Sequence, residues 1–205
     1  MGLPSCLIDP SLPLVLDASV LINLNATGYA KRILDSLPHP IAVTDVVAKE
    51  LERGRSKGRT DANLVDEIVH SGRAKRVALS PDCEAEFLSL VAGDRLSTLD
   101  DGEAATIAWA VSCNGIAVID EKKGIAICRE RHPKTRLAST IDLFRCDQVR
   151  ADLTGEMLGD AVFAALSIAR MRVLETHLAW VIETIGVSRA ALCSSLPRSI
   201  RDQMK

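Results

Sequence analysis

Aromatic residues are scarce in this sequence, since phenylalanine, tryptophan and tyrosine together make up 3% of its 205 residues. The hydrophobic core must therefore consist mainly of leucine, isoleucine, valine and alanine. These residues suit close packing of helices on a parallel sheet better than an all-β sandwich. So few rings also exclude widespread base stacking. We therefore expect Trp109 and Trp180 to be core or interface residues.

Cysteine motifs and long apolar segments are also missing. The six cysteines are scattered, with no C-x-x-C pair and no histidine at zinc spacing, so we expect buried, reduced thiols and no zinc site. No segment approaches the roughly 18 consecutive apolar residues of a membrane span. The N-terminus lacks the basic and apolar regions of a signal peptide. These absences predict a soluble, cytoplasmic protein that does not associate with membranes.

Neither sign of charge dominates, because 25 lysines and arginines face 27 aspartates and glutamates, for a net charge of -2. The chain as a whole is therefore not an electrostatic trap for nucleic acid, although a local basic patch can work beside an acidic site. Arg53, Arg55, Lys57 and Arg59 form such a patch after Glu50. This loop can follow an RNA backbone, or it can equally be a solvated surface loop.

Short apolar runs alternate with helical patterns over the first three-quarters of the chain. We expect strands at residues 13–16, 41–43, 75–79, 116–119 and 135–138. Helical patterns separate them, over residues 19–24, 29–37, 45–53, 61–70, 81–91, 103–113 and 122–131. Strands that alternate with helices are typical of a parallel sheet covered on both faces. The predicted fold class is α/β, a three-layer α/β/α arrangement with a central, mainly parallel sheet.

Strand patterns end at about residue 146, and helical patterns follow over residues 158–172, 174–185 and 188–196. We therefore expect a domain over residues 1–146 and a C-terminal helical extension over residues 147–205. The extension can pack on its own domain, on a second copy or on a protein partner. Its apolar residues are Val162, Phe163, Leu166, Ile168, Val173, Leu174, Trp180, Val181 and Ile182.

Two of the predicted strands end directly in an aspartate, Asp17 and Asp120. Ligands of open parallel sheets bind beyond the carboxyl ends of the strands, so these two side chains should share one edge of the sheet. A single aspartate at such a position is more often a helix cap or a turn former. Two of them, each after an apolar strand, favour a functional site.

Glu50 and Glu103 lie on predicted helices near their junctions with the sheet. Glu103 can instead be a first-turn carboxylate that interacts favourably with the helix dipole. Glu50 can instead be a solvent-exposed helix residue. As a set with Asp17 and Asp120, however, these carboxylates would repel one another unless cations neutralised them. Oxygen ligands alone favour Mg²⁺ or Mn²⁺. Such ions can activate water for attack on a phosphodiester.

Four segments, residues 15–24, 46–51, 99–104 and 117–123, resemble motifs of the PIN-domain ribonucleases, a family that includes the VapC toxins of toxin–antitoxin pairs. The resemblance extends over about residues 12–145. It implies that Asp17, Glu50 and Asp120 bind the metal and that Ser19 orients a ligand. Each motif is weak alone, and their order and spacing together carry the match.

The third motif reads D-D-G-E-A here, where many members have a D-A pair, so either Asp101 or Glu103 supplies the third acid. A subgroup with a G-E-A form favours Glu103. Glu121 is a further candidate ligand. The resemblance implies that Asp17, Ser19, Glu50, Glu103 and Asp120 are the catalytic residues and that Mg²⁺ or Mn²⁺ is the cofactor.

The function that this resemblance implies is metal-dependent endonucleolytic cleavage of single-stranded RNA. It further implies a candidate role as the toxin of a toxin–antitoxin pair, with an antitoxin-like protein or a second copy as partner. Two alternatives remain. One is a non-catalytic binding or regulatory module of the same fold. The other is a phosphatase with Asp17 as nucleophile, although Ser19 stands where such enzymes carry a second aspartate.

Overall fold

Five short parallel strands form the centre of the molecule, in the order β3-β2-β1-β4-β5. The structure is a computed structural model that describes residues 7–94 and 98–202. The strands are β1 (Leu14–Leu16), β2 (Ile41–Thr44), β3 (Ala74–Val77), β4 (Ile116–Val118) and β5 (Arg136–Ala138). Each lies within two residues of its predicted position, and the sheet is parallel throughout, which confirms the predicted fold class.

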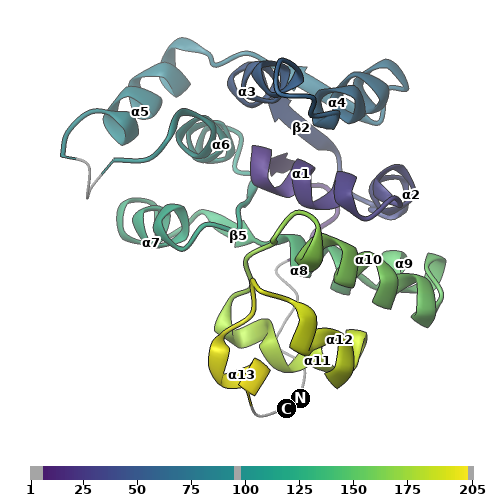
Figure 1. Ribbon diagram of the computed structural model, residues 1–205. Coiled ribbons are helices and arrows are strands. Elements are labelled where there is room, and N and C mark those ends of the chain that lie inside the picture. Colours follow the sequence, from purple (N-terminus) through teal and green to yellow (C-terminus); the bar gives the residue numbers. More distant parts are fainter. Residues whose placement is uncertain (1–6, 95–97, 203–205) are drawn as a thin grey trace.

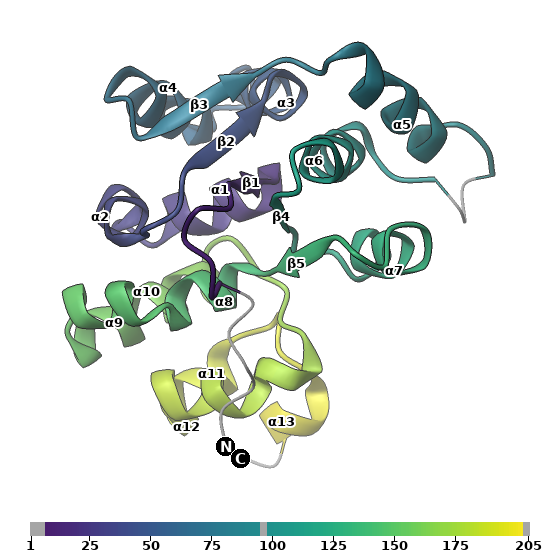
Figure 2. The same cartoon turned by 180° about the vertical axis from the view of Figure 1, so that it is seen from behind.

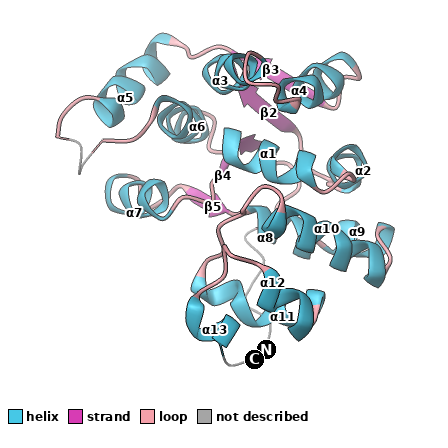
Figure 3. Cartoon of the chain, in the orientation of Figure 1, coloured by secondary structure: helices cyan, strands magenta, loops and turns pink. Residues whose placement is uncertain are grey.

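Alternate residues of the buried strands point to opposite faces of the sheet. Leu14 and Leu16 of β1 pack into one apolar cluster, whereas Val15 packs into another. The first cluster contains residues of α1 to α4 and of α8 to α10, and the second contains residues of α5 to α7. Figure 1 shows these two groups of helices on opposite sides of the sheet, and Figure 3 shows the strands between them.

The helices that cover the sheet fall largely where the sequence predicts them. They are α1 (Ala18–Ala26), α2 (Ala30–Ser36), α3 (Asp45–Arg55), α4 (Asp61–His70), α5 (Pro81–Val91), α6 (Asp101–Ser112), α7 (Lys122–Arg131) and α8 (Thr140–Arg145). Helices α1 and α6 begin earlier than expected, because Asp17 and Asp100 cap them. Both caps are aspartates of the predicted acidic motifs.

The C-terminal segment is helical, as expected, and consists of α9 (Asp147–Asp152), α10 (Gly155–Ser167), η1 (Glu175–His177), α11 (Leu178–Ile185), α12 (Val187–Leu192) and α13 (Arg198–Asp202). Helices α9 and α13 have no counterpart in the sequence prediction. The predicted helix over residues 158–172 is wrong at its C-terminal end. The chain leaves the helix after Ser167, and Arg170 adopts a positive φ of 57°.

Of the three packing options for this extension, the structure realises packing on the chain's own domain. Val162, Leu166 and Val181 are buried in the same apolar cluster as β1, and Trp180 packs against that cluster. Ile168 is the exception, being 70% exposed. Figure 2 shows α11, α12 and α13 beyond α8 and α10, at the end of the molecule. The division at residues 146 and 147 stays a prediction, because this shared core spans it.

The remaining sequence predictions concern cysteines, tryptophans and membrane spans. Cys83, Cys113, Cys128, Cys146 and Cys193 are free thiols, and Cys6 lies outside the described residues. Trp109 packs against the cluster on the α6 side of the sheet, as expected of a core residue. Among the helices of residues 7–94 and 98–202, none is long and apolar enough to cross a membrane.

Candidate functional site

Asp17 and Asp120 lie at the same edge of the sheet, because β1 and β4 are parallel neighbours. The backbone N–H of Asp17 donates to the carbonyl oxygen of Val118 at 3.2 Å, which continues the ladder past the end of β1. Both aspartates are 3% exposed. The strand order thus brings together two acids that are more than a hundred residues apart in sequence.

Asp17 uses one carboxylate oxygen to cap a helix, while its other oxygen lies towards Gly102. Its Oδ2 accepts hydrogen bonds from the backbone N–H of Ser19 at 3.1 Å and from Ser19 Oγ at 2.6 Å. These bonds make Asp17 the N-cap of α1. Burial nevertheless raises the pKa of Asp17 above its usual range, and the nearby charge of Asp100 adds to this effect. The helix-capping role and a ligand role are therefore compatible.

Three carboxylates converge beside Gly102, in the first turn of α6. A Cβ atom on Gly102 would lie 2.5 Å from Glu50 Oε2, 3.3 Å from Asp17 Oδ1 and 3.7 Å from Asp100 Oδ1. Because Gly102 has no Cβ atom, there is room for these three oxygens to meet. Although the Glu50 side chain reaches solvent, desolvation of its carboxyl group, together with Asp17 and Asp100, raises its pKa to about 7.

Glu103 is buried on the side of the cluster that faces α7. Its Oε1 has no hydrogen-bond partner in the described residues, and it would lie 2.9 Å from a Cβ atom on Gly124. Burial, followed by the charges of Asp100 and Asp17, raises the pKa of Glu103 to about 8. A buried carboxylate oxygen without a donor is costly. Such an atom fits a site that a cation completes.

Asp120 is held in place by three donors. The backbone N–H of Thr140 donates to its Oδ1 at 2.8 Å, while Thr140 Oγ1 and Asn23 Nδ2 both donate to its Oδ2. These bonds lower the pKa of Asp120, but desolvation outweighs them and raises it to about 6. Neither Asn23 nor Thr140 is among the predicted site residues. Asn23 lies inside the family-like segment over residues 15–24, so that motif held the signal, whereas Thr140 lies outside the four segments.

The D-D-G-E-A segment presents Asp100 as well as Glu103 to the cluster. Asp100 Oδ1 accepts from the backbone N–H of Glu103 at 3.0 Å and caps α6. Asp101 is exposed and contributes less than Asp100 to raising the pKa of Glu50. Sequence reasoning weighed Asp101 against Glu103 and missed Asp100. The N-cap position before a helix was the signal that could have identified it.

Glu121 occupies the N-cap position of α7, and its charge contributes to raising the pKa of Glu103. Its Oε2 forms an ion pair with Arg172 Nη1 at 2.6 Å. This candidate ligand therefore already has a cation from the C-terminal segment beside it.

The acids are close enough to raise one another's pKa values, but they do not yet form a coordination shell. Within residues 7–94 and 98–202, no three acidic, histidine or cysteine side chains are arranged so that they could hold one ion. Coordination by three of these carboxylates would therefore require side-chain rotation. The donors are all oxygens, and their mutual repulsion is of the kind that Mg²⁺ or Mn²⁺ relieves.

The basic loop after Glu50 is partly neutralised by local ion pairs. Arg55 pairs with Asp66, and Arg59 pairs with Asp61 at 3.0 Å. Arg53 instead lines a groove of about 500 Å³ that also contains Glu50. The other residues of this groove are Val46, Lys49, Phe87, Asp100 and Asp101. Arg53 and Lys49 are thus the cations that lie beside the acids on this side.

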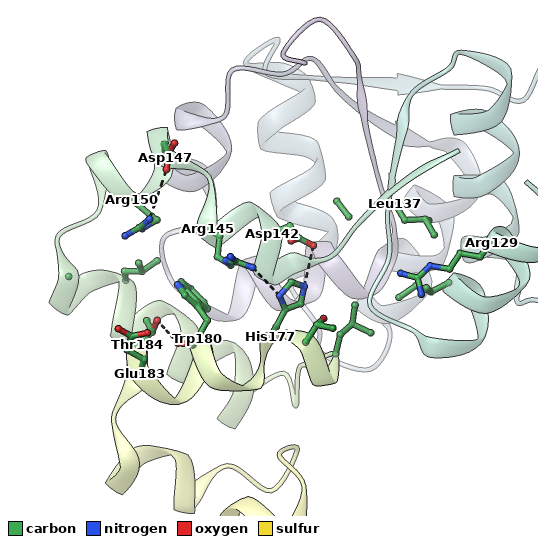
Figure 4. A pocket seen from close by; sticks show the side chains of 16 residues that line it. Arg129, Leu137, Asp142, Arg145, Asp147, Arg150, His177, Trp180, Glu183 and Thr184 are labelled. Carbon is green, nitrogen blue, oxygen red and sulfur yellow. Dashed lines mark hydrogen bonds and ion pairs between the residues drawn. The ribbon is translucent and has the colours of Figure 1, made fainter. Parts of the chain in front are cut away.

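A larger cavity, of about 670 Å³, lies away from the acids, between β5, α7 and the C-terminal helices. Figure 4 shows His177 at its centre, between Asp142 and Arg145. His177 Nε2 lies 3.5 Å from Asp142 Oδ2, and its Nδ1 lies 3.3 Å from Arg145 Nη1. None of the acids of the cluster lines this cavity, so it is separate from the candidate site.

One comparison with known proteins identifies a family for this chain. A protein-family model described as DUF3368: PIN domain matches residues 13–136. A similar solved structure is that of VapBC2 from Rickettsia felis, bound to a DNA fragment from their promoter. It is 18% identical, the alignment covers 62% of this chain and 98% of that chain, and the TM-score is 0.42. A search of curated proteins gives no match.

Proposed function

Because the chain belongs to the PIN-domain family, we propose that it is a metal-dependent endoribonuclease that cleaves single-stranded RNA. One observation carries the proposal: Asp17, Glu50 and Asp100 meet beside Gly102. Glu103 and Asp120 are close enough to Asp17 that its charge raises their pKa values. Repulsive groups of carboxylates that are partly removed from water, as these are, are uncommon without a cation to offset them.

The residues present fit a divalent cation. Glu103 offers an unpartnered oxygen, Asp17 offers the oxygen that does not cap α1, and Glu50 offers Oε2. We assign Asp17, Glu50, Glu103 and Asp120 as the holders of Mg²⁺ or Mn²⁺, with Asp100 as an additional acid in place of Asp101. A bound ion of this kind supplies a more acidic water and stabilises charge on a phosphodiester oxygen.

The chain's own residues orient this site. Ser19 fixes the Asp17 carboxylate, while Asn23 and Thr140 fix that of Asp120, so neither acid has to be ordered when substrate binds. In the metal-free protein the pKa of Glu50 is raised to about 7, and a bound cation would lower it and favour the carboxylate. Hydrolysis by an activated water would leave a 5′-phosphate and a 3′-hydroxyl.

Cleavage of single-stranded RNA with Mg²⁺ by the wild type and by Asp17→Asn tests the proposal. Asparagine is also a good N-cap, so α1 should persist. We expect the rate to fall on the order of 100-fold or more, since loss of a metal ligand removes several kcal/mol of transition-state stabilisation. Glu67→Gln, an exposed change on α4, should cleave like the wild type.

Equal cleavage by wild type and Asp17→Asn would overturn the assignment. A folded wild type that neither binds metal nor cleaves RNA would favour the non-catalytic alternative. From the family resemblance we further propose a toxin role with an antitoxin-like partner, and from the sequence itself we propose self-association through the C-terminal helices and a cytoplasmic location. Light scattering of the pure protein, alone and mixed with proteins encoded beside it, would test the proposed partners.

A further inference from the structure

The loop after α10 brings two arginines from the C-terminal segment to the acidic cluster. Arg170 and Arg172 line a hollow of about 240 Å³ together with Ser19, Asn23 and Asp120. These arginines lie outside residues 13–136, the part of the chain that the family model matches. The hollow therefore combines acids of the family's domain with cations that this chain adds.

The shape of the loop is fixed from both sides. Met171 is 1% exposed in the main apolar cluster, and its N–H donates to the carbonyl oxygen of Ala165 at 3.0 Å. Arg170, just before it, adopts the left-handed conformation with a φ of 57°. Arg172, just after it, pairs with Glu121 at the start of α7. The buried methionine thus holds an exposed arginine on either side of it.

Arg170 is a cation that has no partner among the described residues and lies beside a group of acids. Its guanidinium forms no hydrogen bond or ion pair with any residue that the structure describes. Both oxygens of Asp120 are already engaged by Asn23 and Thr140. Arg59 also lines the hollow, with its Nε paired to Asp61. The five N–H donors of Arg170 therefore remain available to an anion from solution.

We propose that Arg170 binds a phosphate group of the RNA backbone adjacent to the phosphate that is cleaved, with Arg172 and Arg59 at the same hollow. This inference rests on the proposed function, because the acidic site supplies the reason for RNA to lie there. A guanidinium fork matches two phosphate oxygens and stays charged at any working pH. The C-terminal segment thereby acquires a role in substrate binding.

Binding of a short, fluorescently labelled single-stranded RNA to the full chain tests this role. Ca²⁺ replaces Mg²⁺ so that binding is measured apart from cleavage, and gels verify that the RNA stays intact. For Arg170→Gln we expect binding about fivefold weaker near 0.1 M salt, with the slope of log affinity against log salt smaller by about 0.7, as for one lost phosphate contact. Arg198→Gln removes the same charge from an exposed position of α13 and should bind like the wild type.

The outcomes separate this inference from the proposed function. If the wild type binds RNA and Arg170→Gln binds equally well with the same salt slope, the inference is overturned while the nuclease assignment stands. The inference also fails if Arg170→Gln cleaves faster with unchanged RNA binding, since the positive charge of Arg170 would then act only by repelling the metal ions. If the wild type binds no RNA, both proposals fall.

Discussion

Asn23 Nδ2 donates a hydrogen bond of 2.7 Å to Asp120 Oδ2. This bond links the middle of α1 to the segment just after β4. Thr140, at the start of α8, completes the arrangement from the other side. Three donors from two helices thus orient one buried carboxylate. The orientation of Asp120 therefore depends on the docking of α1 and α8, which has consequences for metal binding.

Thr140→Val removes one donor to Asp120 but keeps the shape of the side chain. We expect a higher pKa for Asp120 and about 10- to 100-fold weaker binding of Mn²⁺, as for other losses of a group that orients a ligand. Titration calorimetry measures this affinity. Thr106→Val is the matched control, because Thr106 Oγ1 is buried and has no partner among the residues that the structure describes, so its loss should leave Mn²⁺ binding unchanged. Equal affinity in both variants would contradict the positioning role.

Gly102→Ala should damage the site with little effect on the fold. The added Cβ would lie 2.5 Å from Glu50 Oε2, so the Glu50 carboxylate must move away from Asp17. Alanine is otherwise favoured in a helix, by about 1 kcal/mol over glycine. We expect at least about tenfold weaker metal binding and slower cleavage, with unfolding by urea largely unchanged. Gly155→Ala, in open space at the start of α10, should be active.

The metal-free protein should lose stability as pH rises, partly through Glu103. Its pKa is about 8 when folded and near 4.5 when unfolded, so the folded state binds its proton more tightly. This contribution is present below about pH 4.5 and is lost as pH rises towards 8. Glu103→Gln cannot ionise. Its stability relative to the wild type should therefore improve by roughly 5 kcal/mol between those limits, at about 1.4 kcal/mol per pKa unit.

Urea unfolding in EDTA across this pH range measures the effect. Glu84→Gln, an exposed change on α5, gives the baseline for removing a carboxylate elsewhere. A relative stability of Glu103→Gln that does not change with pH would show that the buried carboxyl ionises as it does in the unfolded chain.

Asp17→Asn should have opposite effects with and without metal. Without metal it relieves repulsion in the cluster, so we expect a melting temperature at or above that of the wild type. With Mg²⁺ or Mn²⁺ at 100 times the dissociation constant, the wild type should gain about 2.7 kcal/mol. The variant should gain much less. Thermal melts with and without metal measure both effects, and an equal gain in the variant would exclude Asp17 as a ligand.

Local patterns in the sequence were sufficient to predict most elements of the fold. The strands β1 to β5 and the acids that follow β1 and β4 were predictable, because residue alternation and strand ends are features of a few consecutive residues. The helix expected over residues 158–172 shows the limit of this approach. Its apolar spacing continues past Ser167, but the burial of Met171 and the left-handed Arg170 end the helix there.

The composition of the site was decided by contacts between distant parts of the chain. Asp100 could be recognised as a helix cap, but its position beside Asp17 and Glu50 depends on how α6 crosses the sheet. Likewise, the place of Arg170 beside Asp120 depends on the docking of the C-terminal segment. Strand order and the burial of charge depend on packing between residues far apart in the chain. The sequence by itself therefore determined which acids end strands, and only the tertiary structure decided which of them meet.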